Sequence, residues 1–291
     1  MIKTIERTGT ESGPTLLLTG RIHGDEPVGT RIIERLIREI DDDILTLAKG
    51  TLKCAPICNQ RAADANTRYL DMNLNRVMSR AIANANKGKH EADLAHAVMN
   101  LIDEVDMLID LHSFPDQTTP AYMICVDDSE LAREMVKASA YKTVLCASDY
   151  LTPGNSQMTI DYAKSQGKPA ILIEAGYHED PDALERGYNA VVNVLATLGF
   201  LDKTPRTSTQ MQNFVVMTDY ILQRDDYELV LPLATAISIK RGDPIYKTRD
   251  GQIITSDKEG AIFAKNMSPK QGEEYCYIAD ITNEWPKKLS F

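Results

Sequence analysis

Two residues that commonly bind metals, His23 and Glu26, follow directly after an apolar run from Thr15 to Thr19. The run predicts a short buried strand, and Pro27 stands at the favoured first position of a following helix. The pair therefore lies in a strand-to-helix turn, at the edge of an α/β sheet where ligands bind. A histidine nitrogen and a carboxylate placed there can hold one ion, although such pairs also occur in ordinary surface turns.

A second histidine follows the apolar run that begins at Met107, where the sequence is Asp110-Leu-His112-Ser. Strand residues alternate between the two faces of a sheet, so Asp110 and His112 point to the same face while Ile109 and Leu111 point to the other. A carboxylate in this position suits a role in orienting the imidazole of a ligand histidine. Taken alone, a histidine on an apolar strand is more often a hydrogen-bonded core residue.

Two further stretches bring polar side chains to expected strand ends. One apolar run ends in Glu174, which predicts a buried strand that carries a carboxylate to the edge of the sheet. The passage from 59 to 76 contains Arg68, Asn75 and Arg76, and its polarity predicts that it lies outside the core. Each residue has a plain alternative, since a lone glutamate can be an ion-pair partner and a lone arginine is usually solvated.

In combination these residues have the chemistry of a catalytic zinc site with one ion per chain. His23, Glu26 and His112 supply two nitrogens and a carboxylate, and a fourth position open to water is typical of a catalytic rather than a structural site. A zinc-bound water has its pKa lowered to about 7, and Glu174 would take its proton during attack on a carbonyl. One of the two arginines would stabilise the oxyanion, and the other would bind a substrate carboxylate.

The same residues resemble the succinylglutamate desuccinylase/aspartoacylase family, a branch of the zinc carboxypeptidase fold. Three segments resemble the family's two metal-ligand motifs and its catalytic strand: Gly20-Arg-Ile-His23-Gly-Asp-Glu26, Asp110-Leu-His112-Ser and Ile173-Glu174-Ala-Gly176. The resemblance covers most of the chain. It implies an amide hydrolase in which His23, Glu26 and His112 hold zinc and Glu174 is the general acid and base.

The resemblance also assigns roles to the polar passage. The segment from Arg68 to Arg76 resembles the family's substrate-binding segment, which implies that Arg68 polarises the scissile carbonyl. Asn75 and Arg76 would then hold a substrate carboxylate. The stretch from Lys240 to Gly251 is similar to part of the carboxyl-terminal domain of aspartoacylase.

Three departures from the family pattern affect the substrate more than the chemistry. Asn73 replaces an aspartate that helps orient the arginines, and Lys164 replaces an arginine that binds a second substrate carboxylate. The positive charge survives in Lys164, but the forked geometry of a guanidinium does not. The tyrosine that the second domain of aspartoacylase contributes has no clear counterpart, because its place falls near Gly272 and only Tyr275 or Tyr277 lies close by.

Hydrophobic periodicity predicts alternating strands and helices after the first turn. Strands are expected at 51–57, 107–113, 121–126, 143–146 and 169–176, and helices at 90–105, 129–140, 158–166 and 181–198. The expected fold class is α/β, with a mixed, mostly parallel sheet and helices on both faces, as in zinc carboxypeptidases. Of the other histidines, His90, His96 and His178 are expected to be structural.

The composition changes in the polar stretch from 202 to 210, where we place a domain boundary. Residues 1–205 would form the zinc hydrolase domain, and residues 206–291 a small antiparallel β domain that caps the active site. Short alternating runs separated by turn signals support the second part of this prediction. They lie at 213–217, 228–234, 244–247, 252–255, 261–264 and 275–281.

The charge and cysteine content limit the classes of partner. The net charge of -10 argues against sequence-independent binding to nucleic acid or to an anionic membrane, and no apolar run is long enough to span a membrane. We therefore expect a small-molecule substrate with carboxylate groups and a cytoplasmic location, and leave open a homo-oligomer. The 5 cysteines are an odd number without a C-x-x-C pair, which predicts buried free thiols.

Three functions remain open at this point. An N-acyl-amino-acid deacylase is favoured, because Arg76 and Lys164 could hold two carboxylates on either side of one amide. A metallocarboxypeptidase acting on short peptides could use the same zinc, glutamate and carboxylate clamp. A non-catalytic metal-binding interaction protein ranks lowest, since every residue that the chemistry needs is present.

Overall fold

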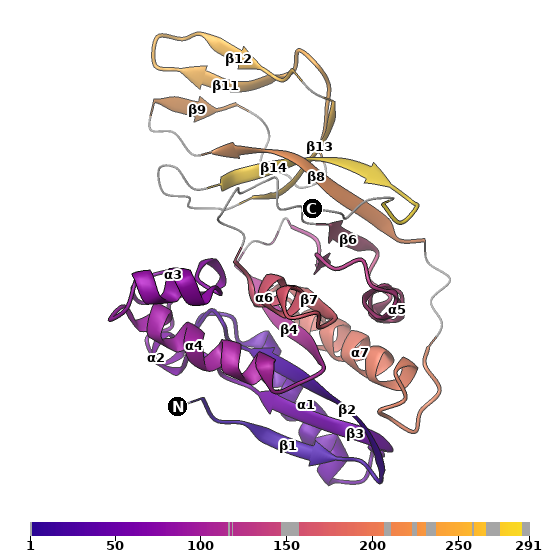
Figure 1. Ribbon diagram of the computed structural model, residues 1–291. Helices are drawn as coiled ribbons and strands as arrows, with labels where there is room; N and C mark the ends of the chain where they lie inside the picture. Colours follow the sequence, from indigo (N-terminus) through magenta and orange to yellow (C-terminus); the bar gives the residue numbers. More distant parts are fainter. Residues whose placement is uncertain are drawn as a thin grey trace.

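The computed structural model describes most of the chain and places a large sheet through its whole length (Figure 1). The described residues are 2–115, 117, 119–146, 157–206, 211–222, 226–230, 237–257, 259–265 and 274–286.

The central sheet of these residues has 11 strands in the order β1-β3-β2-β4-β7-β5-β6-β8-β14-β13-β10. Its first strands are β1 (Ile5–Thr8), β2 (Glu11–Gly20), β3 (Lys49–Ala55), β4 (Met107–Phe114), β5 (Tyr122–Cys125), β6 (Thr143–Cys146) and β7 (Ala170–Tyr177). β3, β2, β4 and β7 are parallel, whereas β5 runs antiparallel to β7 and parallel to β6. The predicted mixed, mostly parallel sheet is confirmed, and the carboxyl ends of β2, β4 and β7 meet at one edge.

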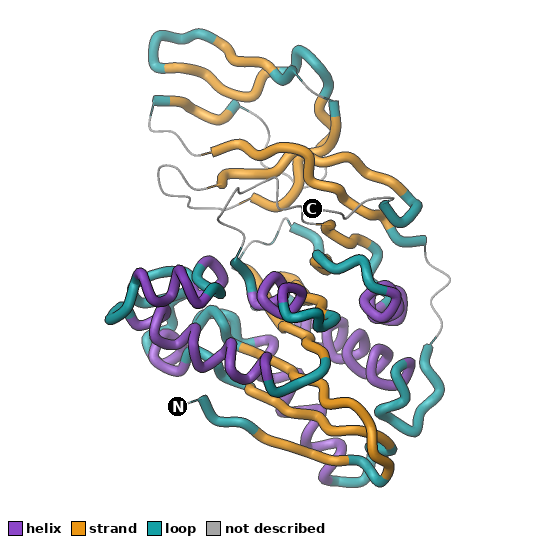
Figure 2. The backbone as a smooth tube through the Cα atoms, viewed as in Figure 1, coloured by secondary structure: helices purple, strands orange, loops and turns teal. Residues whose placement is uncertain are grey.

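Helices cover both faces of the sheet, as predicted (Figure 2). They are α1 (Val28–Asp41), α2 (Gln60–Asp64), α3 (Arg80–Ala85), α4 (His90–Asp103), α5 (Glu130–Ser139), α6 (Thr159–Ser165) and α7 (Pro181–Thr197). Ile109 and Leu111 of β4 share one buried cluster with side chains of α1, α5 and α7. Leu108, on the opposite face of the same strand, joins a second cluster with α3, α4 and α6.

Helix starts follow local capping chemistry. The Ser129 side chain accepts a hydrogen bond from the Ala132 amide at the start of α5, and the Asp180 side chain does the same for Asp182 at the start of α7. Pro181 occupies the first turn of α7. These capping signals explain why the predicted helix bounds agree closely with those observed.

Most of the passage from 59 to 76 is exposed or half-buried, as its polarity predicts. The exceptions are Asn59, Ala62, Leu74 and Asn75, which are buried, and the passage contains α2 and a short 3-10 helix, Leu74–Arg76. The buried amides are tolerated because they are hydrogen bonded: the Asn59 side chain accepts from the Ala62 amide, and Asn75 accepts from the Thr159 amide. The passage therefore lies largely at the surface and is anchored by two buried, hydrogen-bonded amides.

The remaining strands continue the sheet and add a second, smaller one. They are β8 (Asn213–Leu222), β9 (Tyr227–Leu229), β10 (Ile237–Ile239), β11 (Pro244–Thr248), β12 (Ile253–Thr255), β13 (Gly260–Lys265) and β14 (Glu274–Thr282). β8, β14, β13 and β10 pair antiparallel in turn, and β12, β11 and β9 form a 3-stranded antiparallel sheet. β8 also pairs parallel to β6, so the proposed boundary near 205 separates neighbouring strands of one sheet.

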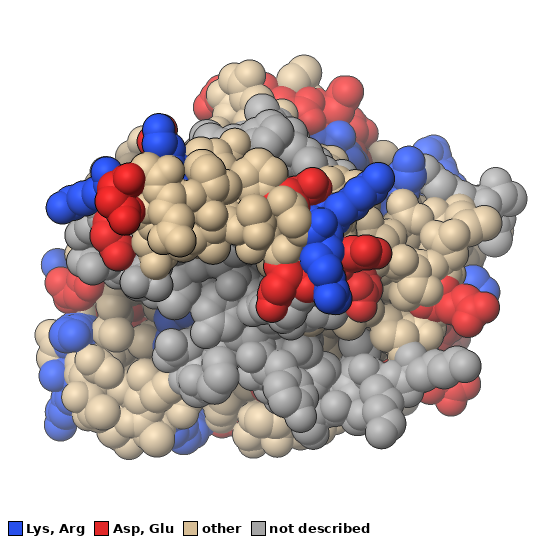
Figure 3. Space-filling view, turned by 90° about the horizontal axis from the view of Figure 1, so that it is seen from above, with Lys and Arg blue, Asp and Glu red and all other residues tan. Residues whose placement is uncertain are grey.

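The surface seen from above mixes both signs of charge (Figure 3). In that view the lysine and arginine side chains that the figure draws lie beside acidic ones rather than in one continuous basic area. Within the described residues, no helix is long and apolar enough to cross a membrane.

Candidate metal centre and active site

The loop after β2 places His23 and Glu26 at the carboxyl edge of the sheet. Gly24 makes this possible, because a Cβ atom there would lie 2.1 Å from the carbonyl carbon of Ala62. The Gly24 amide donates a hydrogen bond to the Arg68 carbonyl (3.2 Å), which fixes this loop against the polar passage. The glycine between the two candidate ligands therefore serves the close approach of two backbone segments.

His23, Glu26 and His112 form a buried cluster whose ligand atoms lie within 4.8 Å of one another. Glu26 lies between the two histidines: its Oε1 is 2.8 Å from His23 Nδ1, and its Oε2 is 2.8 Å from His112 Nδ1. The imidazole rings face each other edge-on with their centroids 5.0 Å apart. Figure 1 shows β4 between β2 and β7, which explains how residues so distant in sequence meet.

The far nitrogen of each imidazole is held by an acceptor. His112 Nε2 donates to Asp110 Oδ2 (2.9 Å), which confirms the contact suggested by their shared strand face. His23 Nε2 donates to Asn73 Oδ1 (2.9 Å). Both rings are therefore oriented with Nδ1 toward Glu26, the arrangement that makes Nδ1 available to an ion. Asn73, which the resemblance connects with the arginines, supports a candidate ligand here.

The electrostatics of the cluster suit a cation. Burial lowers the pKa of His112, but the carboxylates of Asp110 and Glu26 outweigh burial and raise it well above its usual value. Burial raises the pKa of Glu26, but the two histidines outweigh burial and hold that pKa well below its usual value. Burial lowers the pKa of His23. The buried carboxylates thus attract positive charge to the point where the three ligand atoms converge.

Glu174 lies beside this cluster with one oxygen unused. In the sheet, Glu174 on β7 is directly opposite His112 on β4 and Tyr122 on β5. Its Oε2 is buried and accepts no hydrogen bond from the described residues. Burial, followed by the charge of Glu26, raises the pKa of Glu174 to about 7. A carboxyl group with this pKa and a free oxygen can both take and return a proton near neutral pH.

The structure brings Arg68 to the cluster. Its Nη1 donates to Glu26 Oε1 (2.6 Å), while 44% of the side chain remains exposed. Arg76 lies close by in sequence, and its Nη1 donates to the Asn75 carbonyl (2.9 Å). Asn75 Nδ2 lies 3.3 Å from His112 Nε2, so this buried amide contacts the cluster itself.

Lys164 lies on α6, and its predicted substrate role stays a prediction. α6 begins at the site, where the Thr159 hydroxyl donates to Asp110, and Lys164 stands about 7.5 Å further along the helix. Burial raises the pKa of Cys125 to about 12, and the charge of Lys164 opposes this. Lys164 is therefore close enough to Cys125, the last residue of β5, to act on it through its charge.

Glu91 holds the segment from Leu70 to Met72 in place and was not predicted. Its buried carboxylate accepts hydrogen bonds from the amides of Leu70 (2.8 Å), Asp71 (2.9 Å) and Met72 (3.1 Å). Burial raises its pKa, but these amides and the Asn59 side chain lower it further than burial raises it. The signal in the sequence was a glutamate on the apolar stripe of its helix, 3 residues before Leu94.

His178 also lies near the cluster. Its Nδ1 is 2.8 Å from the Ser113 hydroxyl, and its buried Nε2 has no hydrogen-bond partner in the described residues. Burial lowers its pKa, and the charge of Glu26 opposes this. The predicted structural role thus has a named partner, Ser113. The side chains of Tyr275 and Tyr277, and all of Gly272, lie outside the described residues.

One family model matches most of the chain, and solved structures share its fold. The succinylglutamate desuccinylase/aspartoacylase catalytic domain matches residues 12–198. The product-bound ectoine utilization protein EutE (DoeB) from Ruegeria pomeroyi is similar in structure, with a TM-score of 0.74 and 19% identity over 96% of this chain and 89% of that one. Among curated protein sequences, none matches significantly.

Two further solved structures support the same fold. The succinylglutamatedesuccinylase/aspartoacylase from Rhodobacter sphaeroides has a TM-score of 0.72 and 17% identity, over 97% of this chain and 89% of that one. The succinylglutamate desuccinylase from Vibrio parahaemolyticus also has a TM-score of 0.72, with 14% identity over 97% and 92% of the two chains.

Proposed function

The chain belongs to the succinylglutamate desuccinylase/aspartoacylase family, and from this premise we propose that it is a zinc-dependent N-acyl-amino-acid deacylase. The reaction would split an amide bond and release a carboxylate and an amino acid. The observation that carries the proposal is the convergence of His23, Glu26 and His112 beside Glu174, whose free oxygen has no partner in the described residues.

The residues fit one zinc ion. Two imidazole nitrogens and one carboxylate oxygen are a common catalytic zinc set, and each imidazole is held from behind by Asp110 or Asn73. When bound at His23, Glu26 and His112, zinc would supply a Lewis acid that polarises the scissile carbonyl and activates water.

The protein's side chains then supply proton transfer, stabilisation of negative charge and substrate binding. Glu174 takes a proton from the attacking water and returns it to the leaving nitrogen, which a pKa of about 7 favours. Arg68 stabilises the negative charge on the carbonyl oxygen, for which its exposed guanidinium beside Glu26 is suitably placed. Asn75 and Arg76 hold the carboxylate of the substrate.

A small substrate is favoured over a long peptide. The strands after residue 206 resemble the part of aspartoacylase that caps the substrate channel, and such a cap would exclude peptides. One similar structure is described as product bound, which supports a small-molecule ligand in this fold. A metallocarboxypeptidase acting on short peptides is the second candidate, since it needs the same zinc, Glu174 and Arg76.

We also propose a cytoplasmic location. Four of the 5 cysteines have described side chains, namely Cys54, Cys58, Cys125 and Cys146, and these are free and buried, which suits a reducing compartment. Free thiols persist in such a compartment. The chain could form a homo-oligomer there.

A substrate panel tests the proposed function. Zinc-loaded protein should hydrolyse N-acyl aspartates and glutamates faster than peptides of four or more residues, with product formation followed by liquid chromatography. If tetrapeptides are the better substrates, the carboxypeptidase is correct and the cap must be open. If nothing is hydrolysed by protein that retains its zinc, the chain is a metal-binding interaction protein.

A further inference from the structure

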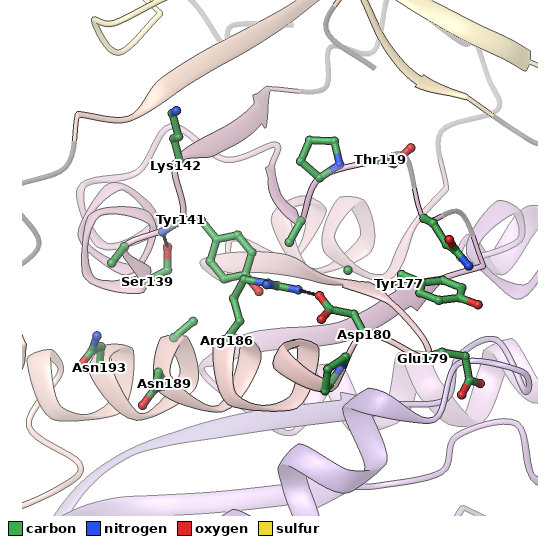
Figure 4. Close-up of a pocket in the computed structure, with 17 residues that line it drawn as sticks. Thr119, Ser139, Tyr141, Lys142, Tyr177, Glu179, Asp180, Arg186, Asn189 and Asn193 are labelled. Carbon is green, nitrogen blue, oxygen red and sulfur yellow. Dashed lines mark hydrogen bonds and ion pairs between the residues drawn. The ribbon is translucent and has the colours of Figure 1, made fainter. Parts of the chain in front are cut away.

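The segment after β7 lies between a cavity and the His-Glu-His cluster. Tyr177 and Glu179 line the cavity, which has a volume of about 800 Å³ (Figure 4). Among the charged groups of its lining, Arg186 is already paired with Asp180 (2.6 Å). His178, between Tyr177 and Glu179, does not line this cavity and is held beside the cluster instead. Its side chain therefore belongs to the candidate active site.

His178 has one ring nitrogen bound and one unused. Its Nδ1 lies 2.8 Å from the Ser113 hydroxyl, and its buried Nε2 has no hydrogen-bond partner in the described residues. Ser113 is fully buried and has no second partner for its hydroxyl there, so it pairs its hydrogen by donating to Nδ1. Burial lowers the pKa of His178, which keeps the ring neutral at pH 7. The ring hydrogen is then on Nε2, a buried donor without an acceptor.

His178 and Asn75 lie on opposite sides of the cluster. Asn75 Nδ2 is 3.3 Å from His112 Nε2, on the face of β4 that also carries Asp110. Ser113 is the next residue of β4, so its side chain points to the other face, where it contacts His178. The proposed function places the amino-acid carboxylate at Asn75 and the scissile amide at the metal. The acyl group then extends toward His178.

An unpaired acceptor lies close to this unpaired donor. Asp25 Oδ1 is buried and has no hydrogen-bond partner in the described residues. The Ser113 amide donates to Glu26 Oε2 (3.2 Å), which brings His178 against the loop that carries Asp25. Asp25 and Arg68 both act on the His178 ring through their charges, and the proposed function places Arg68 at the scissile carbonyl. A donor and an acceptor beside the acyl group are therefore left for a ligand to satisfy.

A hydroxyl can pair with both atoms, because it accepts one hydrogen bond and donates another. An alkyl chain would leave His178 Nε2 and Asp25 Oδ1 unpaired. A carboxylate could accept from His178, but it has no hydrogen for Asp25 and would meet the negative charges of Asp25 and Glu179. The pair therefore favours a neutral hydroxyl over either of the other groups.

We propose that the acyl group of the substrate carries a hydroxyl next to the scissile carbonyl, bound by His178 Nε2 and Asp25 Oδ1. The substrates are then N-(α-hydroxyacyl) amino acids, and His178 is a residue that determines specificity for the acyl group. This inference rests on the proposed function for the place of the amide, but its test measures binding and needs no turnover.

Three ligands that differ in one group test the proposal. Zinc-loaded Glu174→Gln, which lacks the proposed general base, is titrated by calorimetry with N-glycolyl-, N-propionyl- and N-malonyl-L-glutamate. The glycolyl ligand should bind about tenfold more tightly than the other two, because a site that pairs with a hydroxyl rejects analogues that lack it. Equal affinity for the propionyl ligand, tighter binding of the malonyl ligand, or no binding would overturn the proposal. If the preference is present but wild-type protein hydrolyses none of the three, the proposed function fails and this inference stands.

Two variants of His178 in the same background separate ligand binding from the contact with Ser113. A glutamine amide nitrogen reaches about as far as Nε2, whereas an asparagine amide reaches only the place of Nδ1. His178→Gln should therefore keep the preference for the glycolyl ligand, and His178→Asn should lose it without weakening the propionyl ligand. The reverse pattern would refute the assignment, because the contact with Ser113 would then set the preference. Loss of zinc from both variants would also refute it, because His178 would then act on the metal centre.

Discussion

His112 on β4 and Glu174 on β7 are directly paired near the ends of their strands, but their side chains differ in hydrogen bonding. His112 on β4 contacts Asp110 through Nε2 and Glu26 through Nδ1, and the whole side chain is 1% exposed. Glu174, its direct neighbour on β7, keeps Oε2 without a hydrogen-bond partner in the described residues.

The difference separates two roles. A metal ligand benefits from fixed orientation, and neighbours that hold an imidazole from behind provide it. A proton carrier needs a free oxygen and a pKa near the working pH, and Glu174 has both. The pattern of hydrogen bonds therefore fits the proposed roles of His112 as a metal ligand and Glu174 as the acid and base.

The largest effect should come from Glu174→Gln. The amide keeps the shape of the side chain but cannot take a proton, so turnover of an N-acyl amino acid should fall by about a hundredfold or more. Steady-state kinetics with zinc-loaded protein measures this. The exposed Glu130→Gln, in the first turn of α5, is the control and should keep full turnover. Normal turnover in Glu174→Gln would remove Glu174 from the mechanism.

The same variant should change the pH dependence of stability in metal-free protein. The pKa of Glu174 rises from 4.5 to about 7 on folding, so the folded state keeps a proton that the unfolded state releases. This destabilises the fold as pH rises from 4.5, and the full penalty, at most about 3 kcal/mol, is present above pH 7.

Glu174→Gln removes this penalty. Urea unfolding should therefore show the variant more stable than the wild type at pH 8, with the difference vanishing as the pH falls to 4.5. Equal stability at both pH values would mean that burial does not disfavour the charged carboxylate.

Asp110→Asn should weaken the hydrogen bond that orients the His112 imidazole, so that this side chain, like Glu174, is less firmly fixed. The variant keeps an acceptor but loses the negative charge behind the imidazole, so zinc affinity should fall by about ten- to a hundredfold. Competition with a chromophoric chelator measures the affinity. Asn73→Ser removes the side-chain amide that contacts His23 Nε2. It should lower the zinc affinity less than Asp110→Asn does, because the lost group is neutral. A larger loss in Asn73→Ser would reverse this assignment.

The smallest effect should come from Lys164→Ala. Lys164 is half-buried and stands about 7.5 Å along α6 from Thr159, which contacts Asp110, so the substrate role expected from the sequence stays a prediction. The variant should raise KM for dicarboxylic substrates about two- to fivefold more than for monocarboxylic ones, because an ion pair of a partly exposed lysine contributes up to about 1 kcal/mol. Equal changes in KM for both kinds of substrate would remove the substrate role.

Much of the fold and the cluster could be predicted because the signals are local. Strand alternation placed Asp110 behind His112, and an apolar run ending in a carboxylate placed Glu174 at the sheet edge. Helix starts at Ser129 and Pro181 follow from capping chemistry that a few residues determine.

What could not be predicted depends on distant pairing. The buried Glu91 carboxylate accepts hydrogen bonds from the amides of residues 70–72, which share no periodicity with its helix, so the sequence did not reveal this anchor. Asn73 contacts His23 across 50 positions of sequence. The pairing of β8 with β6 depends on strand order in three dimensions, which a change of composition near residue 205 does not reveal.

The position of the metal tests the account most directly. Zinc content, measured by mass spectrometry after reconstitution and desalting, should be one ion per chain in the wild type and in Glu174→Gln. His112→Ala should retain little zinc, because the ion loses one of three protein ligands that lie within 4.8 Å of one another. Equal zinc content in His112→Ala and the wild type would contradict the assignment of His23, Glu26 and His112 as the metal site.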